Sequence, residues 1–267
     1  MGCCVSKQQV ARTNRAAKWK TTGIVGLRDS NLKTLPNQVL DLARSVRTLD
    51  VTHNRLVDLP VEIGGLVNLQ RLMASENVLQ RLPSTIGKLQ SLKVLALDEN
   101  RLTTLPDELG LLVRLERLSV SMNALTSLPS ALGSLRNLTL LNVSHNKLML
   151  LPESLGSCYS LEELLANDNS IAELPYSICS LVHLKALGMD NNKLTQLPPL
   201  LLKECTSLQS LSIHGNPITA EELQLMDAFD EYESRRQRKF NKQLDANVML
   251  NSKGLDEGVD LKLLNKA

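Results

Sequence analysis

The chain has 267 residues, 43% of them hydrophobic, and a formal net charge of +2 at pH 7. So small a charge argues against nucleic acid as a partner, and no apolar run approaches the ~18 residues that a membrane span needs. The N-terminus also lacks the apolar stretch of a secretory signal.

The first 22 residues begin with the features of a lipid anchor. The opening Met1-Gly2-Cys3-Cys4-Val5-Ser6 matches M-G-x-x-x-[ST], in which Gly2 is myristoylated once Met1 has been removed. One myristoyl chain binds a bilayer only marginally, so stable anchoring needs a second signal. Cys3 and Cys4, beside the acylated amine, are well placed for S-palmitoylation.

A basic run comes after this motif, with no acidic residue before Asp29. Near an anionic leaflet each of its cations can contribute about 1 kcal/mol; they are Lys7, Arg12, Arg15, Lys18 and Lys20. Trp19 either enters the membrane interface or covers the first of the sequence repeats that begin at residue 23. We therefore expect residues 1–22 to bind the inner leaflet, on the cytoplasmic side of the plasma membrane or an endomembrane, with a cytosolic pool. The opening resembles those of doubly acylated signalling proteins such as Src-type kinases.

Residues 23–217 repeat one phrase, L-x-x-L-x-L-x-x-N-x-L-x-x-L-P, nine times with irregular first and last copies. Its asparagines form a column with a spacing of 23 residues: Asn54, Asn77, Asn100, Asn123, Asn146, Asn169 and Asn192. The proline register places Ser30, and not Asn31, at the head of this column. A fixed period of this length predicts a solenoid, in which each repeat buries its apolar face by stacking on its neighbours.

The phrase is the signature of the leucine-rich repeat family, and the other half of each repeat, L-P-x-x-[LI]-G-x-L-x-x-L, resembles the intracellular Ras-interacting group. The start, the size and the ending resemble plant proteins of the leucine-rich repeat-containing protein 57 kind. We predict an α/β leucine-rich-repeat solenoid, or horseshoe, with a parallel inner β-sheet and short helical or 3₁₀ turns on the convex side. An asparagine amide both donates and accepts hydrogen bonds, so we interpret the asparagine column as scaffold.

The candidate partner-binding surface is the concave face, where we place variable residues at strand positions between the buried leucines. It comprises His53, Arg55, Glu76, Asp98, Glu99, Arg101, Met122, His145, Lys147, Asp168, Asp190 and Lys193. After the asparagines, a cation recurs at every other repeat, about 10 Å apart. This is either a basic ridge facing an acidic partner or ordinary solvated loop charge. Because the charges along the face nearly cancel, a protein is the expected partner.

The C-terminal segment begins with a helix-capping box from Thr219 to Glu222. We predict one capping helix over residues 218–245, covering the last repeat, and a loose tail over 246–267. A basic cluster, Arg235, Arg236, Arg238, Lys239 and Lys242, is a second membrane contact, a nuclear-localisation-like run or a solvated face.

No catalytic or metal-binding arrangement emerges from the remaining residues. His53 and His145 lie four repeats apart, near 19 Å, and Cys158 and Cys205 fill leucine positions, as buried hydrophobes do. We expect no enzyme activity, metal or cofactor. The chain is interpreted as a monomeric, lipid-anchored signalling adaptor, and the Ras-group resemblance implies a small GTPase or its regulator as partner. The alternative is a soluble regulatory subunit of an enzyme such as a phosphatase.

Overall fold

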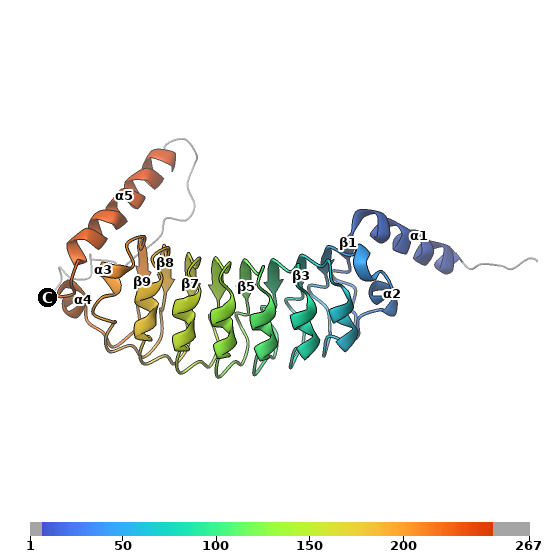
Figure 1. Ribbon diagram of the computed structural model, residues 1–267, viewed down its shortest axis with the longest axis horizontal. Coiled ribbons are helices and arrows are strands. Elements are labelled where there is room, and N and C mark those ends of the chain that lie inside the picture. The colour runs from blue at the N-terminus through green and yellow to red at the C-terminus, as the bar shows by residue number, and fades with distance from the viewer. Residues whose placement is uncertain (1–6, 248–267) are drawn as a thin grey trace, which may run out of the picture.

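The computed structural model describes the backbone of residues 7–247 and the side chains of residues 15–241. The predicted acylation sites Gly2, Cys3 and Cys4 and the residues after Asn247 lie outside the described part. The described residues form one sheet of nine strands, and Figure 1 shows the strands in a single row with helices at both ends. All neighbouring strands are parallel, and their order in the sheet follows the chain from β1 to β9. The predicted leucine-rich-repeat solenoid is therefore confirmed.

Each strand has three residues. They are β1 (Ile24–Gly26), β2 (Thr48–Asp50), β3 (Arg71–Met73), β4 (Val94–Ala96), β5 (Arg117–Ser119), β6 (Leu140–Asn142), β7 (Glu163–Leu165), β8 (Ala186–Gly188) and β9 (Ser210–Ser212).

Opposite the sheet run short helices, mostly of the predicted 3₁₀ type. The 3₁₀ helices are η1 (Ala43–Ser45), η2 (Val61–Gly65), η3 (Ser84–Lys88), η4 (Asp107–Leu111), η5 (Ser130–Ser134), η6 (Glu153–Ser157) and η7 (Tyr176–Ser180). The α-helices are α1 (Lys7–Thr22), α2 (Asn37–Leu40), α3 (Leu201–Glu204), α4 (Ala220–Gln224) and α5 (Phe229–Asn247). A proline precedes each of η2 to η7, and its fixed φ turns the chain into the helix.

The core lies between the two sides and consists of stacked leucine layers. The central leucines of neighbouring strands, such as Leu72, Leu95 and Leu118, are fully buried and directly opposite one another in the sheet. Cys158 and Cys205 are buried among the leucines, as predicted. Burial raises the pKa of the Cys158 thiol to about 11 and that of Cys205 to about 12, because desolvation disfavours the thiolate.

The asparagine column is structural, as interpreted. The amide nitrogen of Asn100 donates to the carbonyls of Leu97 and Ala74, each at 3.0 Å, and its oxygen accepts from the N–H of Leu79 at 3.0 Å. The same pattern recurs from Asn54 to Asn216. Each asparagine therefore ties its own repeat to the preceding repeat at two points.

Glycine on the convex side lets successive repeats stack closely. A Cβ on Gly110 would lie 2.4 Å from the carbonyl oxygen of Ala131 in the next repeat. Cys179 takes the glycine's place in η7, where the next repeat has the α-helix α3 in place of a 3₁₀ turn. The stacking contact that requires glycine thus ends at the repeat before α3.

The N-terminal helix α1 closes the first end of the solenoid. Trp19 is buried in the hydrophobic core, so of its two predicted roles it covers the first repeat. Gly23, at φ +71°, ends the helix, and its N–H donates to the Trp19 carbonyl at 2.8 Å. A positive φ is accessible to glycine without strain. Helix α1 is therefore joined to the first strand of the solenoid through Gly23 alone.

At the other end the predicted single capping helix is divided in two. The predicted capping box is present, since the Thr219 hydroxyl accepts from the Glu222 N–H and the Glu222 carboxylate accepts from the Thr219 N–H. The pKa of Glu222 is lowered because its carboxylate accepts from the Thr219 N–H and from the Thr219 hydroxyl. After α4, Ala228 adopts φ 63° and the chain turns into α5. The break lets Tyr232 enter the core, where it is 2% exposed.

Candidate interaction surface

The inner face of the solenoid presents two rows of strand side chains, because alternate residues of a strand point to the same side. The first row, here called the strand row, takes the first residue of each strand: Ile24, Thr48, Arg71, Val94, Arg117, Leu140, Glu163, Ala186 and Ser210. The second takes the third residue, including Met73, Ala96 and Leu165. Sequence reasoning missed both rows, although the x-L-x alternation of each repeat marks them.

All twelve residues predicted for the concave face lie just beyond the strands rather than on them. The position before each asparagine has φ of 53° or 54°, a left-handed turn at the third residue after the strand. This position holds His53, Glu76, Glu99, Met122, His145 and Asp168. These side chains therefore form the edge of the inner face, and the correction arises because the strands have only three residues.

Asp98 and Asp190, also predicted to contact a partner, form hydrogen bonds to neighbouring repeats. Asp98 accepts hydrogen bonds from the hydroxyl of Ser121 at 2.6 Å and from its N–H at 2.9 Å. Asp190 accepts from the Ser212 hydroxyl at 2.7 Å and the His214 N–H at 2.7 Å. Both carboxylates are half-buried and stabilise the sheet edge.

Two histidines of this edge pair with carboxylates of adjacent repeats. His53 contacts Asp29, and this contact raises the pKa of His53 by a hydrogen bond and by charge attraction. His145 lies 3.5 Å from Asp168. The described residues include no group of three or more His, Cys, Asp or Glu side chains that could hold a metal ion.

The cations after the asparagine column also lie beyond the ends of the strands. Arg55, Arg101, Lys147 and Lys193, here called the basic ridge, are exposed. Val78, Ala124 and Ser170 occupy the alternate repeats and are half-buried. None of the four cations forms an ion pair with another described residue. The ridge is available to an outside group.

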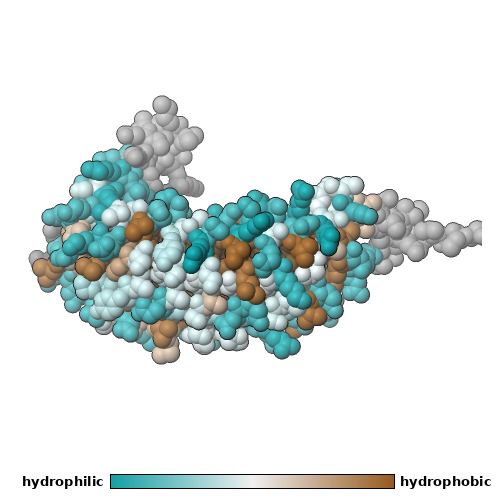
Figure 2. All heavy atoms as spheres, in the orientation of Figure 1, coloured by the Kyte–Doolittle hydropathy of each residue, from teal (hydrophilic) through white to brown (hydrophobic). Residues whose placement is uncertain are grey.

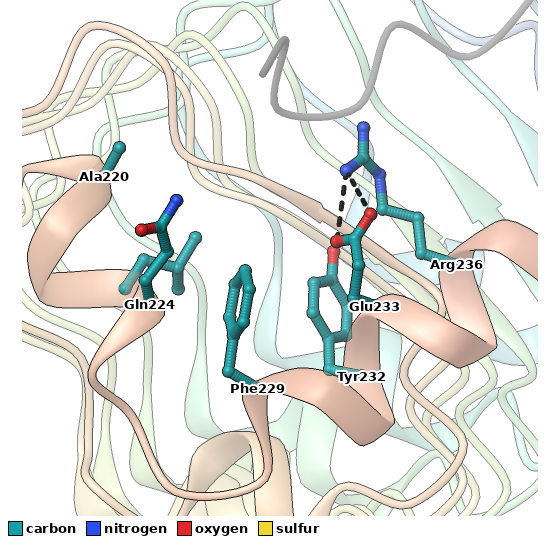
Figure 3. A pocket seen from close by; sticks show the side chains of 7 residues that line it. Ala220, Gln224, Phe229, Tyr232, Glu233 and Arg236 are labelled. Carbon is teal, nitrogen blue, oxygen red and sulfur yellow. Dashed lines mark hydrogen bonds and ion pairs between the residues drawn. The ribbon is translucent and has the colours of Figure 1, made fainter. Parts of the chain in front are cut away.

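The predicted C-terminal basic cluster is partly used within the protein. Arg235 donates to the carbonyls of Leu208 at 3.1 Å and Leu202 at 2.9 Å, which attaches α5 to the last repeat. Arg236 pairs with Glu233 at 3.0 Å, at the rim of a small notch between α4 and α5 that Figure 3 shows. Phe229 lies at the centre of this view. The first half of the cluster therefore acts as part of the cap.

The face of the molecule seen in Figure 2 is largely polar. Figure 2 shows hydrophobic residues as separate spots among hydrophilic ones on the visible face. Within the described residues, no helix is long and apolar enough to cross a bilayer. That visible face therefore offers chiefly polar and charged groups, with small apolar spots between them.

Comparison with known proteins agrees with this architecture. Residues 90–148 match the family described as leucine rich repeat. A protein of Oryza sativa subsp. japonica, "Plant intracellular Ras-group-related LRR protein 7", is 69% identical over 261 residues, which are 98% of this chain and 100% of the rice protein. The chain belongs to the plant intracellular Ras-group-related leucine-rich repeat proteins.

Solved structures place this leucine-rich repeat protein among other members of the fold. A leucine-rich repeat protein of Leptospira interrogans matches with a TM-score of 0.58 and 32% identity, over 72% of this chain and 54% of that longer one. An internalin of Listeria monocytogenes matches with a TM-score of 0.67 and 23% identity, over 79% of this chain and 62% of its own. At that identity the internalin supports the fold alone.

Proposed function

We propose that this leucine-rich repeat protein is a non-enzymatic adaptor in intracellular signalling, held at a membrane by acylation and binding a protein on its inner face. The repeat fold and the relatives support an interaction scaffold. The observation that carries the binding surface is the basic ridge, four exposed cations without an ion pair among the described residues.

The membrane half of the proposal rests on the N-terminal end. Gly2, Cys3 and Cys4 supply the acylation sites, with the basic run beside them. In α1, Arg15, Lys18 and Lys20 are exposed while Trp19 holds the helix to the first repeat. Figure 1 shows α1 projecting beyond the end of the sheet. A bilayer bound there would leave the inner face open to the cytosol.

Fractionation tests the anchor. Gly2→Ala removes the myristoylation site, and Cys3→Ser/Cys4→Ser removes the second signal while keeping the first. We expect the Gly2→Ala protein to move almost wholly to the soluble fraction, and the double cysteine variant to do so in part. A membrane fraction that is the same for Gly2→Ala and the unmodified chain contradicts the anchor and leaves the soluble regulatory subunit.

The partner half is tested by proximity labelling with the full chain. The rice relative is named Ras-group-related, which makes a small GTPase or its regulator the first candidate to look for among labelled proteins. Charge reversal along the basic ridge, with Arg55, Arg101, Lys147 and Lys193 each changed to Glu, should remove the partner from the labelled set. The matched control reverses four exposed cations on other surfaces, Lys33, Arg81, Arg114 and Arg136. Partner labelling that survives ridge reversal contradicts the basic ridge as the binding surface.

A further inference from the structure

The strand row carries a charge pattern that the proposed function does not use. Arg71, Val94, Arg117, Leu140 and Glu163 lie directly opposite one another on five adjacent strands. Along the row, an apolar side chain therefore separates the first cation from the second, and another separates the second cation from the anion. The three charged residues are exposed and the two apolar ones are half-buried.

The three charges have no ion-pair partner among the described residues. Their neighbours at the preceding position differ, since Lys93 pairs with Glu116 and Lys185 with Glu162, each at 2.7 Å. The sheet thus neutralises the charges beside the strand row and leaves those of the row itself free. Exposed Arg side chains can grip a carboxylate through two parallel hydrogen bonds.

The spacing of the row selects the conformation of the segment it can bind. Strands lie about 4.8 Å apart, so Arg71 and Arg117 are about 10 Å apart and Arg71 and Glu163 about 19 Å. In a polyproline-II segment every third residue faces the same side, at about 9.3 Å, and every sixth at about 18.6 Å. Helix positions seven and fourteen apart lie at about 10.5 and 21 Å. A helix therefore fits less well, because its third contact would lie about 2 Å too far along the row. A β-strand does not fit, because residues three apart face opposite sides.

We propose that strands β3 to β7 bind an extended, polyproline-II-like protein segment of the pattern acid-x-x-acid-x-x-base. Its two carboxylates contact Arg71 and Arg117, its basic residue contacts Glu163, and the intervening residues lie over Val94 and Leu140. This deepens the proposed function by naming the chemistry of the bound segment, and it rests on binding at the inner face.

The probe is a capped, fluorescent peptide Asp-Pro-Pro-Asp-Pro-Pro-Lys, with binding to the full chain followed by anisotropy at low salt, where screening is weak. Reversing the row in Arg71→Glu/Arg117→Glu/Glu163→Arg should weaken binding about tenfold or more, since exposed pairs contribute a few tenths to 1 kcal/mol each. The reversed variant should regain affinity for Lys-Pro-Pro-Lys-Pro-Pro-Asp. That exchange of preference supports the proposal even though the absolute affinity is modest.

Two controls separate the row from general electrostatics. Arg81→Glu/Arg114→Glu, which reverses two exposed cations outside both the strand row and the basic ridge, should leave peptide affinity unchanged within about twofold. The peptide Asp-Pro-Asp-Pro-Pro-Pro-Lys, with the same composition and altered spacing, should bind more weakly to the unmodified chain. No binding to the unmodified chain, equal loss in the Arg81→Glu/Arg114→Glu variant, or no exchange of preference overturns the proposal.

The outcomes are independent of those for the proposed function. If the peptides fail while ridge reversal still removes the labelled partner, the inner face binds protein and the strand-row pattern is wrong. If the peptides behave as expected while the chain remains soluble and labels no partner, the strand row binds but the membrane adaptor is refuted.

Discussion

Replacing one asparagine of the column tests how its hydrogen bonds stabilise the fold. In Asn100→Ala the N–H of Leu79, which is fully buried, loses its bond to the Asn100 oxygen, and no other acceptor contacts it in the described structure. The carbonyls of Leu97 and Ala74 each keep one donor, because they also accept from the asparagines of neighbouring repeats, Asn123 and Asn77. The damage therefore reduces chiefly to one orphaned donor.

A buried donor without a partner costs about 1–3 kcal/mol, and the lost amide contacts place our expectation at about 2–3 kcal/mol. Urea unfolding followed by circular dichroism measures the change, and amide exchange at Leu79 reports it locally. The matched control is Thr103→Ala, an exposed residue three positions away, which should change stability by less than about 0.5 kcal/mol. An Asn100→Ala protein as stable as this control would refute the reasoning.

Three further predictions concern the cap, the sheet edge and the core. Arg235→Ala should cost about 2 kcal/mol, because it removes two charge-assisted bonds to the last repeat; Arg238→Ala, at an exposed site, should be near neutral in the same urea assay. NMR titration should give His53 a pKa above 6.5 that falls in Asp29→Asn. With the folded pKa raised, the His53 contribution to stability is complete below the unfolded pKa and is lost as pH rises through the folded one; a His53 pKa that Asp29→Asn leaves unchanged contradicts the pairing. Cys158, with a pKa of about 11, should resist iodoacetamide at pH 8 until the chain unfolds. Mass spectrometry measures the extent of labelling, and rapid labelling of the folded chain would contradict the burial of Cys158.

The solenoid was predictable because its determinants repeat and act locally. Leucine spacing specifies the core, proline the entry into each 3₁₀ turn, and asparagine the closing of the strand, so nine copies of one pattern support one another. The ends were harder. Trp19 had two plausible roles in sequence, and only its packing on the first repeat decides between them. The turn at Ala228 has no glycine or proline before it, so the break before α5 had no local signal.

The candidate surface was predicted in part. The basic ridge follows from residue spacing and is exposed, as expected. The hydrogen bonds of Asp98 and Asp190 join different repeats, so their internal role depends on the stacking register and not on neighbours in sequence. The strand row was readable from alternation, but the asparagine column led to a surface that lies beyond the ends of the strands. Partner identity depends on a second molecule, which one sequence does not contain.

The equal stacking of glycine-containing repeats has a consequence for the length of the array. Because these repeats share one interface, removing residues 84–106, a whole unit of 23, should keep the sheet register while bringing Arg71 onto the strand beside Arg117, about 5 Å away. Charges in this array recur at every second repeat. Removing two units therefore keeps the alternation of charged and uncharged repeats across the junction, whereas removing one unit interrupts it. Alternating features make the number of repeats itself a determinant of specificity, so that gain or loss of a single unit would redirect binding without any change in the fold.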